Sequence, residues 1–188
     1  KKTKKKIYVE RTGGALHHID KIINFYPNAK VILNLRNPLE TAISMRNYPF
    51  FRMYELMLHK KNLSKWNFKK KKNYKFFGNM LNSWYLKFFK YKKKISNKNF
   101  FVYSYENLML NPEETLKNLI LFILDKKKVD RYTKNFIKLH KKNIKFKGLK
   151  FNQLNLKDRT NLKKSLNTTI NKIEKNFGKN IYGKLNNF

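Results

Sequence analysis

The segment from Lys30 to Tyr48, KVILNLRNPLETAISMRNY, constrains the fold of this chain more than any other stretch. Val31 to Leu35 is an almost unbroken apolar run, which is typical of a strand covered on both faces in a parallel sheet. Asn37 suits the N-cap position of a following helix, and Pro38 suits its first turn, where a missing N–H costs nothing. The segment therefore predicts a strand that feeds directly into a helix.

This junction also brings anion-binding groups together. Arg36 follows the strand directly, beside the positive end of the helix dipole. Asn37 and Ser44 are seven residues apart, close to two helical turns, so we expect both side chains on the same side of the helix. We also expect free backbone N–H groups of the first turn at the same crevice, the usual ligand position at the end of parallel strands. An ordinary strand–cap–helix with a surface arginine is the alternative.

A second strand–helix junction lies near residue 100. The segment NFFVYSY at 99–105 is typical of another buried strand, and we predict that residues 31–36 and 100–104 are parallel strands of one sheet. Asn111 and Pro112 are predicted to begin a later helix, with Glu114 placed for a capping box. Glu106 is expected to be a structural partner inside the fold. Apolar residues at helical spacing predict one buried face of the later helix: Leu116, Leu119, Ile120 and Ile123.

Both junctions resemble motifs of the sulfotransferases that use 3′-phosphoadenylyl sulfate (PAPS). R-N-P-x-x-x-A-x-S, from Arg36 to Ser44, is similar to the signature whose Arg and Ser contact the 3′-phosphate. Y-E-N-L-M-L-N-P, from Tyr105, is similar to the Y-E-D-L block, whose Tyr lies near the adenine. The resemblance implies an α/β fold with a P-loop-type parallel sheet flanked by helices, and cofactor-binding roles for Arg36, Ser44 and Tyr105. It implies transfer of a sulfuryl group from PAPS to a hydroxyl or amine of an unidentified acceptor, without a metal.

The segment before the first junction resembles the same family. ERTGGALHHIDKI at 10–22 is similar to its E-K-T-P wording and the helix that follows. Arg11 stands where the family usually has Lys, and the resemblance implies that Arg11 stabilises the transferred sulfuryl group. Two other positions depart from the family pattern, Gly13 for Pro and Asn107 for Asp. The residues themselves predict a short strand at 6–10, then a turn and a helix.

The family's first phosphate loop, P-K-[S/T]-G-T-[T/S], has no counterpart in this sequence. We therefore expect the chain to be the C-terminal part of a sulfotransferase, with the loop that holds the 5′-phosphosulfate lying before Lys1. On that expectation, residues 1–188 alone are inactive. Glu10, His17 and His18 are candidates for the catalytic base only by elimination. For the two histidines, an ordinary place near the surface of a helix is the alternative to a metal-binding or base role.

The charge balance raises a rival function. The 45 Lys and Arg residues against 11 Asp and Glu give a net charge of +34, which is typical of nucleic-acid or polyanion binding without catalysis. A lysine-rich run at 60–75 carries aromatic residues suited to base stacking, Trp66, Phe68 and Tyr74, although a surface loop is the other interpretation. Only 6 of the 45 basic residues are Arg, the residue whose planar fork suits base recognition. A nucleic-acid partner is therefore not expected.

Length and composition bound the domain organisation. The 188 residues, of which 41% are hydrophobic, predict a single domain, in which 49–77 is a variable lysine-rich insert and 125–188 is a helical C-terminal part. A long helix is expected at 78–95, with Trp84 on its core side. No apolar run reaches the roughly 18 residues of a membrane span. The absence of Cys fits a reducing compartment. Together these features predict a cytoplasmic protein, or one in the Golgi lumen if its relatives are membrane-anchored.

Overall fold

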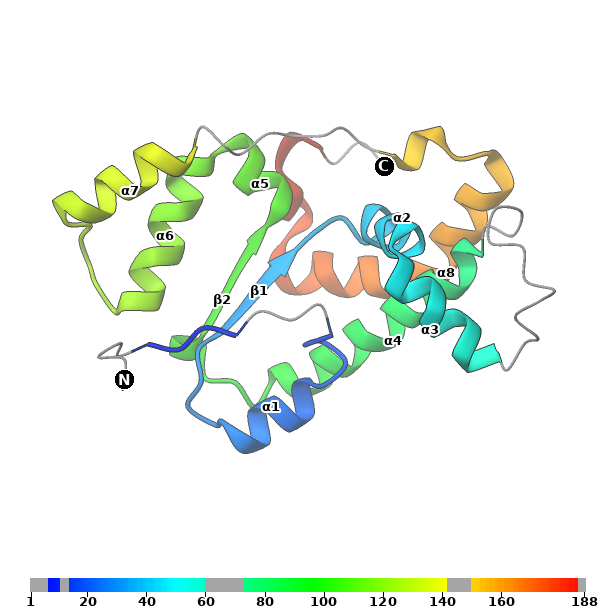
Figure 1. Ribbon diagram of the computed structural model, residues 1–188, viewed down its shortest axis with the longest axis horizontal. Coiled ribbons are helices and arrows are strands. Elements are labelled where there is room, and N and C mark those ends of the chain that lie inside the picture. The colour runs from blue at the N-terminus through cyan, green and yellow to red at the C-terminus, as the bar shows by residue number, and fades with distance from the viewer. Residues whose placement is uncertain (1–6, 11–13, 60–72, 142–149, 186–188) are drawn as a thin grey trace.

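The structure is a computed structural model that describes residues 7–10, 14–59, 73–141 and 150–185. Two parallel strands lie at its centre with helices on both sides (Figure 1). β1 (Val31–Leu35) pairs with β2 (Phe100–Ser104) in a register that runs from Val31 opposite Phe100 to Leu35 opposite Ser104. The prediction of two parallel strands in one sheet is confirmed. Within the described residues the sheet holds these two strands, so the α/β fold is mostly helical.

The helices divide into those before and those after β2. The first group is α1 (Ile19–Phe25), α2 (Pro38–Asn47), α3 (Pro49–His59) and α4 (Tyr74–Lys92). The second is α5 (Tyr105–Leu110), α6 (Pro112–Leu124), α7 (Arg131–Lys141) and α8 (Leu156–Phe177). Short 3-10 helices stand at η2 (Asn97–Asn99), η3 (Phe151–Gln153) and η4 (Lys179–Leu185). Across the ranges that the structure describes, no helix combines the length and hydrophobicity that crossing a lipid bilayer requires.

The core lies on one side of the strands, where α2, α4 and α8 meet. Its fully buried side chains include Leu35, Phe77, Phe88 and Leu162. α6 and α7 lie on the other side of the strands (Figure 1), where the rings of Phe101 in β2 and Phe122 in α6 stack with centroids 5.2 Å apart. Because successive side chains of a strand point to opposite faces, the sheet has one face on each group of helices.

α4 begins earlier than the sequence predicts. The side chain of Asn73 accepts a hydrogen bond from the N–H of Phe76 (3.3 Å) and so caps the helix one turn before Gly78. Gly78 therefore lies inside α4, at its contact with α8. A Cβ at Gly78 would stand 2.0 Å from Oγ and 3.0 Å from Cβ of Ser165. The missing side chain lets the two helices approach closely.

Two other local predictions are wrong. Ile7 to Glu10 is not a strand, because no described strand lies beside it to accept its hydrogen bonds; Tyr8 is 86% exposed. At α6 the capping box does not form, because the N–H of Asn111 already donates to the carbonyl of Asn107 (2.7 Å).

The apolar side of α6 is less buried than predicted. Leu116, Leu119, Ile120 and Ile123 are all only partly buried, and Thr115 is the one residue classed as buried among those that the structure describes in this helix. Phe122 takes the contact with β2 instead. The helix therefore packs on the sheet along a narrower line than its sequence indicates.

Candidate functional site

The N-terminus of α2 is held by two side-chain oxygens. Oδ1 of Asn37 accepts hydrogen bonds from the N–H groups of Leu39 (2.9 Å) and Glu40 (3.4 Å), so the predicted N-cap is confirmed. The N–H of Asn37 donates to Oε1 of Glu106 (2.9 Å), a carboxylate that comes from α5. These three bonds fix the chain at the exit of β1.

These bonds overturn one sequence expectation. The N–H groups of Asn37, Leu39 and Glu40 already have side-chain acceptors, and Pro38 has no N–H. The N–H of Thr41 donates to the carbonyl of Asn37 (2.9 Å). The first turn of α2 therefore does not offer free backbone N–H groups to a ligand. An anion at this junction would depend on side chains.

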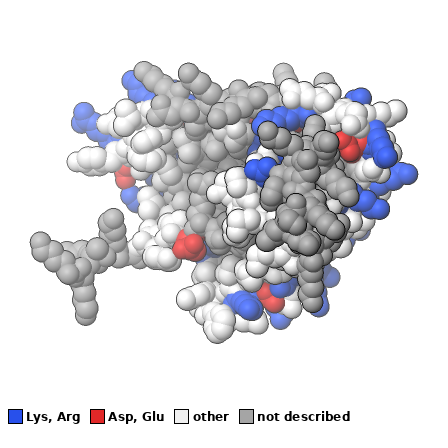
Figure 2. All heavy atoms as spheres, turned by 45° about the vertical axis from the view of Figure 1, so that its right-hand side comes forward, with Lys and Arg blue, Asp and Glu red and all other residues white. Residues whose placement is uncertain are grey.

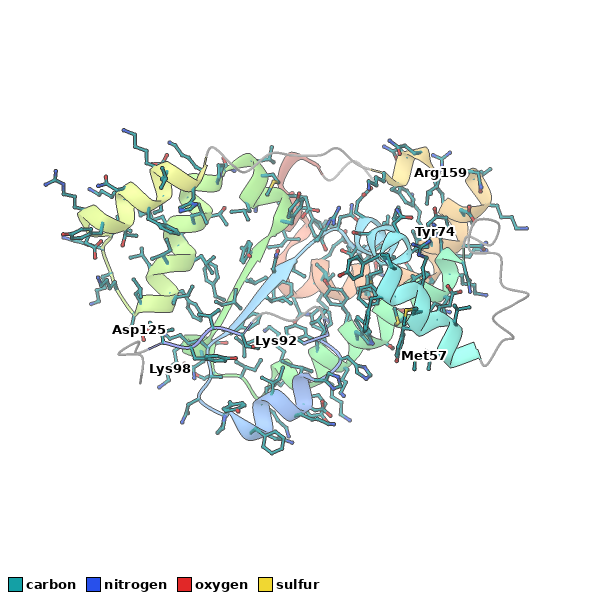
Figure 3. The ribbon with its side chains drawn as sticks, viewed as in Figure 1. Met57, Tyr74, Lys92, Lys98, Asp125 and Arg159 are labelled. Carbon is teal, nitrogen blue, oxygen red and sulfur yellow. The ribbon has the colours of Figure 1, made fainter. Side chains whose placement is uncertain are left out.

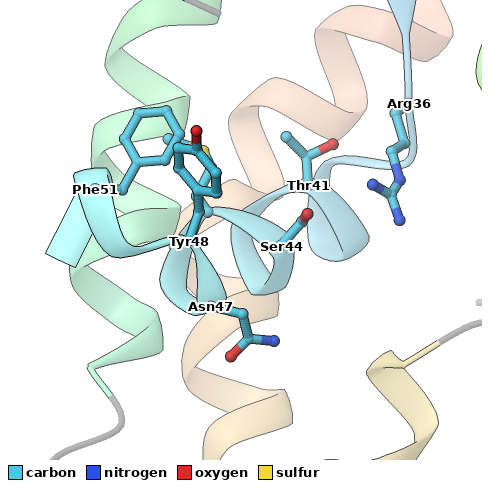
Figure 4. Close-up of a pocket in the computed structure, with 7 residues that line it drawn as sticks. Arg36, Thr41, Ser44, Asn47, Tyr48 and Phe51 are labelled. Carbon is cyan, nitrogen blue, oxygen red and sulfur yellow. The ribbon is translucent and has the colours of Figure 1, made fainter. Parts of the chain in front are cut away.

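A pocket of about 360 Å³ opens beside the same junction. Its lining comes from the end of β1, from α2 and from the start of α3: Arg36, Thr41, Ser44, Met45, Asn47, Tyr48 and Phe51. Figure 4 shows the hydroxyls of Thr41 and Ser44 on the side of α2 that faces Arg36, with the rings of Tyr48 and Phe51 at the other end. The pocket thus has a cationic, hydroxyl-bearing end and an aromatic end.

Arg36 and Ser44, predicted to share one site, line this pocket together. The expected companion Asn37 does not: its side chain is 2% exposed and is turned inward to cap α2. Thr41 takes its place, three residues before Ser44 on the same helical face. The spacing of Thr41 and Ser44 could be read from the sequence. Nothing in the sequence, however, distinguished Thr41 as a pocket residue from the other hydroxyl-bearing residues of the chain.

The two hydroxyls in the pocket differ in availability. Oγ1 of Thr41 donates its proton to the carbonyl of Asn37 (3.0 Å). Ser44 is an exposed residue that faces the pocket. Ser44 is therefore the better donor toward a bound anion.

Tyr105 contacts Arg36 directly. The centre of the Arg36 guanidinium lies 5.0 Å from the centroid of the Tyr105 ring, within the range of a cation–π interaction. Both residues come directly after paired strand ends, since Leu35 and Ser104 are opposite each other in the sheet. In the part of the chain that the structure describes, no salt bridge occupies Arg36. Its charge is oriented by an aromatic ring and stays available to a ligand.

Glu106 is the buried acid behind this site. It is 2% exposed, and burial raises the pKa of its carboxyl, while the N–H of Asn37 and the charge of Arg36 act in the opposite direction. Glu40 is buried nearby at 1% exposure, and its Oε1 accepts from the N–H of Phe151 (2.6 Å). The sequence predicted a structural partner at Glu106, and its role as acceptor for Asn37 agrees with that.

The other sequence candidates lie elsewhere. Arg11, Trp66 and Phe68 are outside the described residues. Tyr74, the third aromatic residue proposed for base stacking, is 5% exposed and lies among side chains of neighbouring helices (Figure 3). On the face shown in Figure 2, the described Lys and Arg side chains lie in several separate groups.

The base candidates are not among the residues that line the pocket. Glu10 accepts a hydrogen bond from the hydroxyl of Tyr8 (2.9 Å) at an exposed position. The ring of His17 lies 4.6 Å from that of His18 and 5.7 Å from that of Trp84. Partial desolvation, followed by the charges of His18 and Lys87, lowers the pKa of His17. Trp84 is 8% exposed and packs in the core, as its helical position predicted. Among the described residues no group of three His, Cys, Asp or Glu is arranged to hold a metal.

The similarity of this chain to known proteins lies in the part of the chain that holds this site. The profile of the sulfotransferase family matches residues 1–124, more than half of the chain. The matched segment contains β1, α2, β2 and α5, and therefore Arg36, Ser44, Tyr105 and Glu106. No match was found among curated proteins or among solved structures. The chain belongs to the sulfotransferase family.

Proposed function

We propose that this chain carries the 3′-nucleotide half of a PAPS-dependent sulfotransferase site, on a P-loop-type α/β scaffold. Arg36 and Ser44 bind the 3′-phosphate, and Tyr105 lies beside the adenine. The observation that carries the proposal is that Arg36, from the end of β1, and Ser44, from the second turn of α2, line one pocket. Family membership supports a transferase activity.

The donor set fits a phosphate dianion. Arg36 supplies a planar fork that can bind two phosphate oxygens at once. Ser44 and Thr41 add hydroxyls, and the pocket lining contains no carboxylate to repel the ligand. The volume of about 360 Å³ lies within the usual range for small-molecule pockets. Since the backbone N–H groups of α2 are already bonded, side chains supply the recognition.

The remaining contacts hold this donor set in place. Tyr105 restrains the Arg36 guanidinium through its ring face. Glu106 fixes the backbone of Asn37, the residue directly after Arg36. In the proposed complex, Tyr105 therefore links recognition of the base to recognition of the phosphate.

Bound PAPS supplies the sulfuryl group, which leaves a phosphate oxygen and forms a new bond to a hydroxyl or amine of the acceptor. The acceptor loses a proton to a base, and the nucleotide departs as adenosine 3′,5′-bisphosphate. Arg11 is proposed to stabilise charge on the transferred group. Of the chain's own residues, Arg36, Ser44 and Tyr105 bind and orient the nucleotide.

The test compares two nucleotides that differ at one position. Adenosine 3′,5′-bisphosphate and adenosine 5′-monophosphate are titrated against the wild-type chain and Arg36→Ala. We expect the wild type to prefer the bisphosphate, and Arg36→Ala to lose about ten- to a hundredfold of that affinity, because a bond to a charged group contributes roughly 1.5–3 kcal/mol. Affinity for the monophosphate should change little.

Lys172→Ala removes an exposed cation on α8 and serves as the control for general charge. It should bind both nucleotides as the wild type does. Equal bisphosphate affinity in wild type and Arg36→Ala would overturn the assignment of the 3′-phosphate site. An equal loss in Lys172→Ala would favour non-specific polyanion binding instead.

A further inference from the structure

α7 is an outer helix with apolar residues on two sides. Its sequence, RYTKNFIKLHK, places Ile137 inward at 4% exposure, on the side that packs against α6. Figure 1 shows α7 as the outermost element at its end of the molecule, beyond α6 and on the opposite side of the strands from α3. Ile137 is therefore the buried apolar residue of α7, and the others are left on the outside.

Three of those outer residues form a continuous line. Tyr132, Phe136 and Leu139 are 88%, 51% and 69% exposed. They are spaced four and three residues apart, so they lie on one face of the helix, and we call this line the outer ridge. Phe136 is steadied by the ring of His140, whose centroid lies 4.3 Å away. A single exposed apolar residue needs no explanation, but a ridge of three on one helix face indicates a contact surface.

A cationic line runs beside the ridge. Arg131, Lys134 and Lys138, spaced three and four residues apart, are all exposed, and we call them the basic stripe. The helix contains no Asp or Glu of its own. Lys141 pairs with Glu113 (2.6 Å), whereas no salt bridge among the described residues involves the basic stripe. Two more exposed lysines, Lys127 and Lys128, stand in the turn that leads into α7.

We propose that α7 docks on an anionic membrane surface. The outer ridge enters the headgroup region, where aromatic and aliphatic side chains of interfacial helices lie, and the basic stripe contacts the anionic headgroups. A nucleic acid would engage the cations but would leave Leu139 unburied. An apolar groove on a protein would bury the ridge but would not need the stripe. A charged bilayer surface satisfies both features of the same helix.

This docking leaves the pocket free, because α3 and the aromatic end of the pocket lie across the strands from α7 (Figure 1). The proposal is therefore independent of the nucleotide site. It concerns peripheral attachment through one helix and no membrane span.

The experiment is flotation of the full chain with phosphatidylcholine vesicles that contain or lack phosphatidylserine. We expect binding to the phosphatidylserine vesicles and about tenfold weaker binding by Tyr132→Ser/Phe136→Ser. The matched control is Phe25→Ser/Tyr26→Ser, which removes the same two residue types at 76% and 68% exposure from another surface. This control should bind as the wild type does. Circular dichroism checks that each variant keeps its helices.

The charge component is tested separately. Lys134→Glu/Lys138→Glu should remove most of the preference for phosphatidylserine. Lys164→Glu/Lys172→Glu changes the net charge by the same amount, but on the exposed side of α8. This variant should retain most of the preference for phosphatidylserine. Equal losses in both pairs would assign the binding to overall charge and would overturn the proposal.

A gain-of-signal variant covers the case in which the serine variant fails to fold. Tyr132→Trp keeps an aromatic ring at the most exposed ridge position, and its added emission should shift to shorter wavelength on phosphatidylserine vesicles. Absence of that shift overturns the proposal. The proposal is also overturned if Tyr132→Ser/Phe136→Ser keeps its affinity for vesicles but no longer binds poly-uridine. The same holds if this variant keeps its affinity for vesicles but no longer forms a concentration-dependent dimer that the wild type forms.

Discussion

The backbone N–H of Asn37 donates a hydrogen bond of 2.9 Å to the buried carboxylate of Glu106. Each residue stands two positions after the last paired strand residues, Leu35 of β1 and Ser104 of β2. The residues between them, Arg36 and Tyr105, contact each other through a guanidinium and a ring. Contacts between the two segments thus continue past the paired strand ends and set the position of Arg36.

Glu106→Ala should lower both stability and nucleotide affinity, because it leaves the N–H of Asn37 buried without an acceptor. An unsatisfied buried group costs about 1–3 kcal/mol, which denaturant unfolding can measure. Glu106→Gln keeps an oxygen acceptor and should retain the bisphosphate affinity of the wild type. If Ala and Gln weaken nucleotide binding equally, the bond to Asn37 does not position Arg36.

Stability should fall as pH rises through the titration of Glu106. Burial raises the pKa of this carboxyl above its ordinary value of 4.5, so the folded state holds a proton that the unfolded state has already released. Its stabilising contribution is complete below pH 4.5 and is lost as the pH passes the raised value. Urea midpoints measured across this range should show a decline in the wild type that is absent in Glu106→Gln. Parallel curves for the two proteins would contradict the prediction.

Arg36→Lys should recover only part of the bisphosphate affinity that Arg36→Ala loses, because an ammonium cannot reproduce a bidentate fork. Ser44→Ala should weaken binding less than Arg36→Ala, by about fivefold or roughly 1 kcal/mol, since a hydroxyl is a neutral donor. Thr41→Val should cost still less, as the proton of Thr41 is already donated to Asn37. Isothermal titration of the four variants gives the order. A larger loss in Thr41→Val than in Ser44→Ala would reverse the assigned roles.

Tyr105→Leu should weaken bisphosphate binding by a few fold, because it removes the ring that orients Arg36, and a cation–π contact contributes about 0.5–1 kcal/mol at partly exposed sites. Tyr105→Phe preserves the ring and should bind nearly as the wild type does. The pair separates the ring face from the phenol hydroxyl. An equal loss of bisphosphate affinity in Tyr105→Leu and Tyr105→Phe would assign the effect to the hydroxyl.

Gly78→Ala should destabilise the protein although alanine favours helices by about 1 kcal/mol over glycine. The added methyl group would overlap the side chain of Ser165 and stand 3.1 Å from Cδ1 of Leu162. Overpacking of this kind costs about 1–3 kcal/mol, and thermal unfolding should show a lower midpoint. Gly78→Ala/Ser165→Ala removes the nearest atom and should recover part of the loss. An unchanged midpoint in the single variant would show that α4 and α8 can move apart freely.

Local sequence patterns determined the two junctions of this protein. The apolar runs before Arg36 and Tyr105 predicted both strands, and Asn37 with Pro38 predicted the start of α2, because strand burial and helix capping depend on adjacent residues. The R-N-P-x-x-x-A-x-S spacing also indicated that Arg36 and Ser44 would share a site, since helix geometry relates positions within two turns.

Tertiary structure decided what no local pattern contains. The sequence could not show that Glu106 takes the N–H of Asn37 from 69 residues away, so it overestimated the free N–H groups at the junction. Ile7 to Glu10 has the composition of a strand, but a strand forms only where a neighbour accepts its hydrogen bonds. Tyr74 and the residues of the outer ridge of α7 are all large hydrophobic side chains, but the structure treats them differently. Tyr74 is only 5% exposed, whereas the ridge residues are exposed. Whether a side chain is buried depends on which helices and strands pack together. Because the hydrophobic effect is not directional, that packing is determined by the whole chain and not by a local segment.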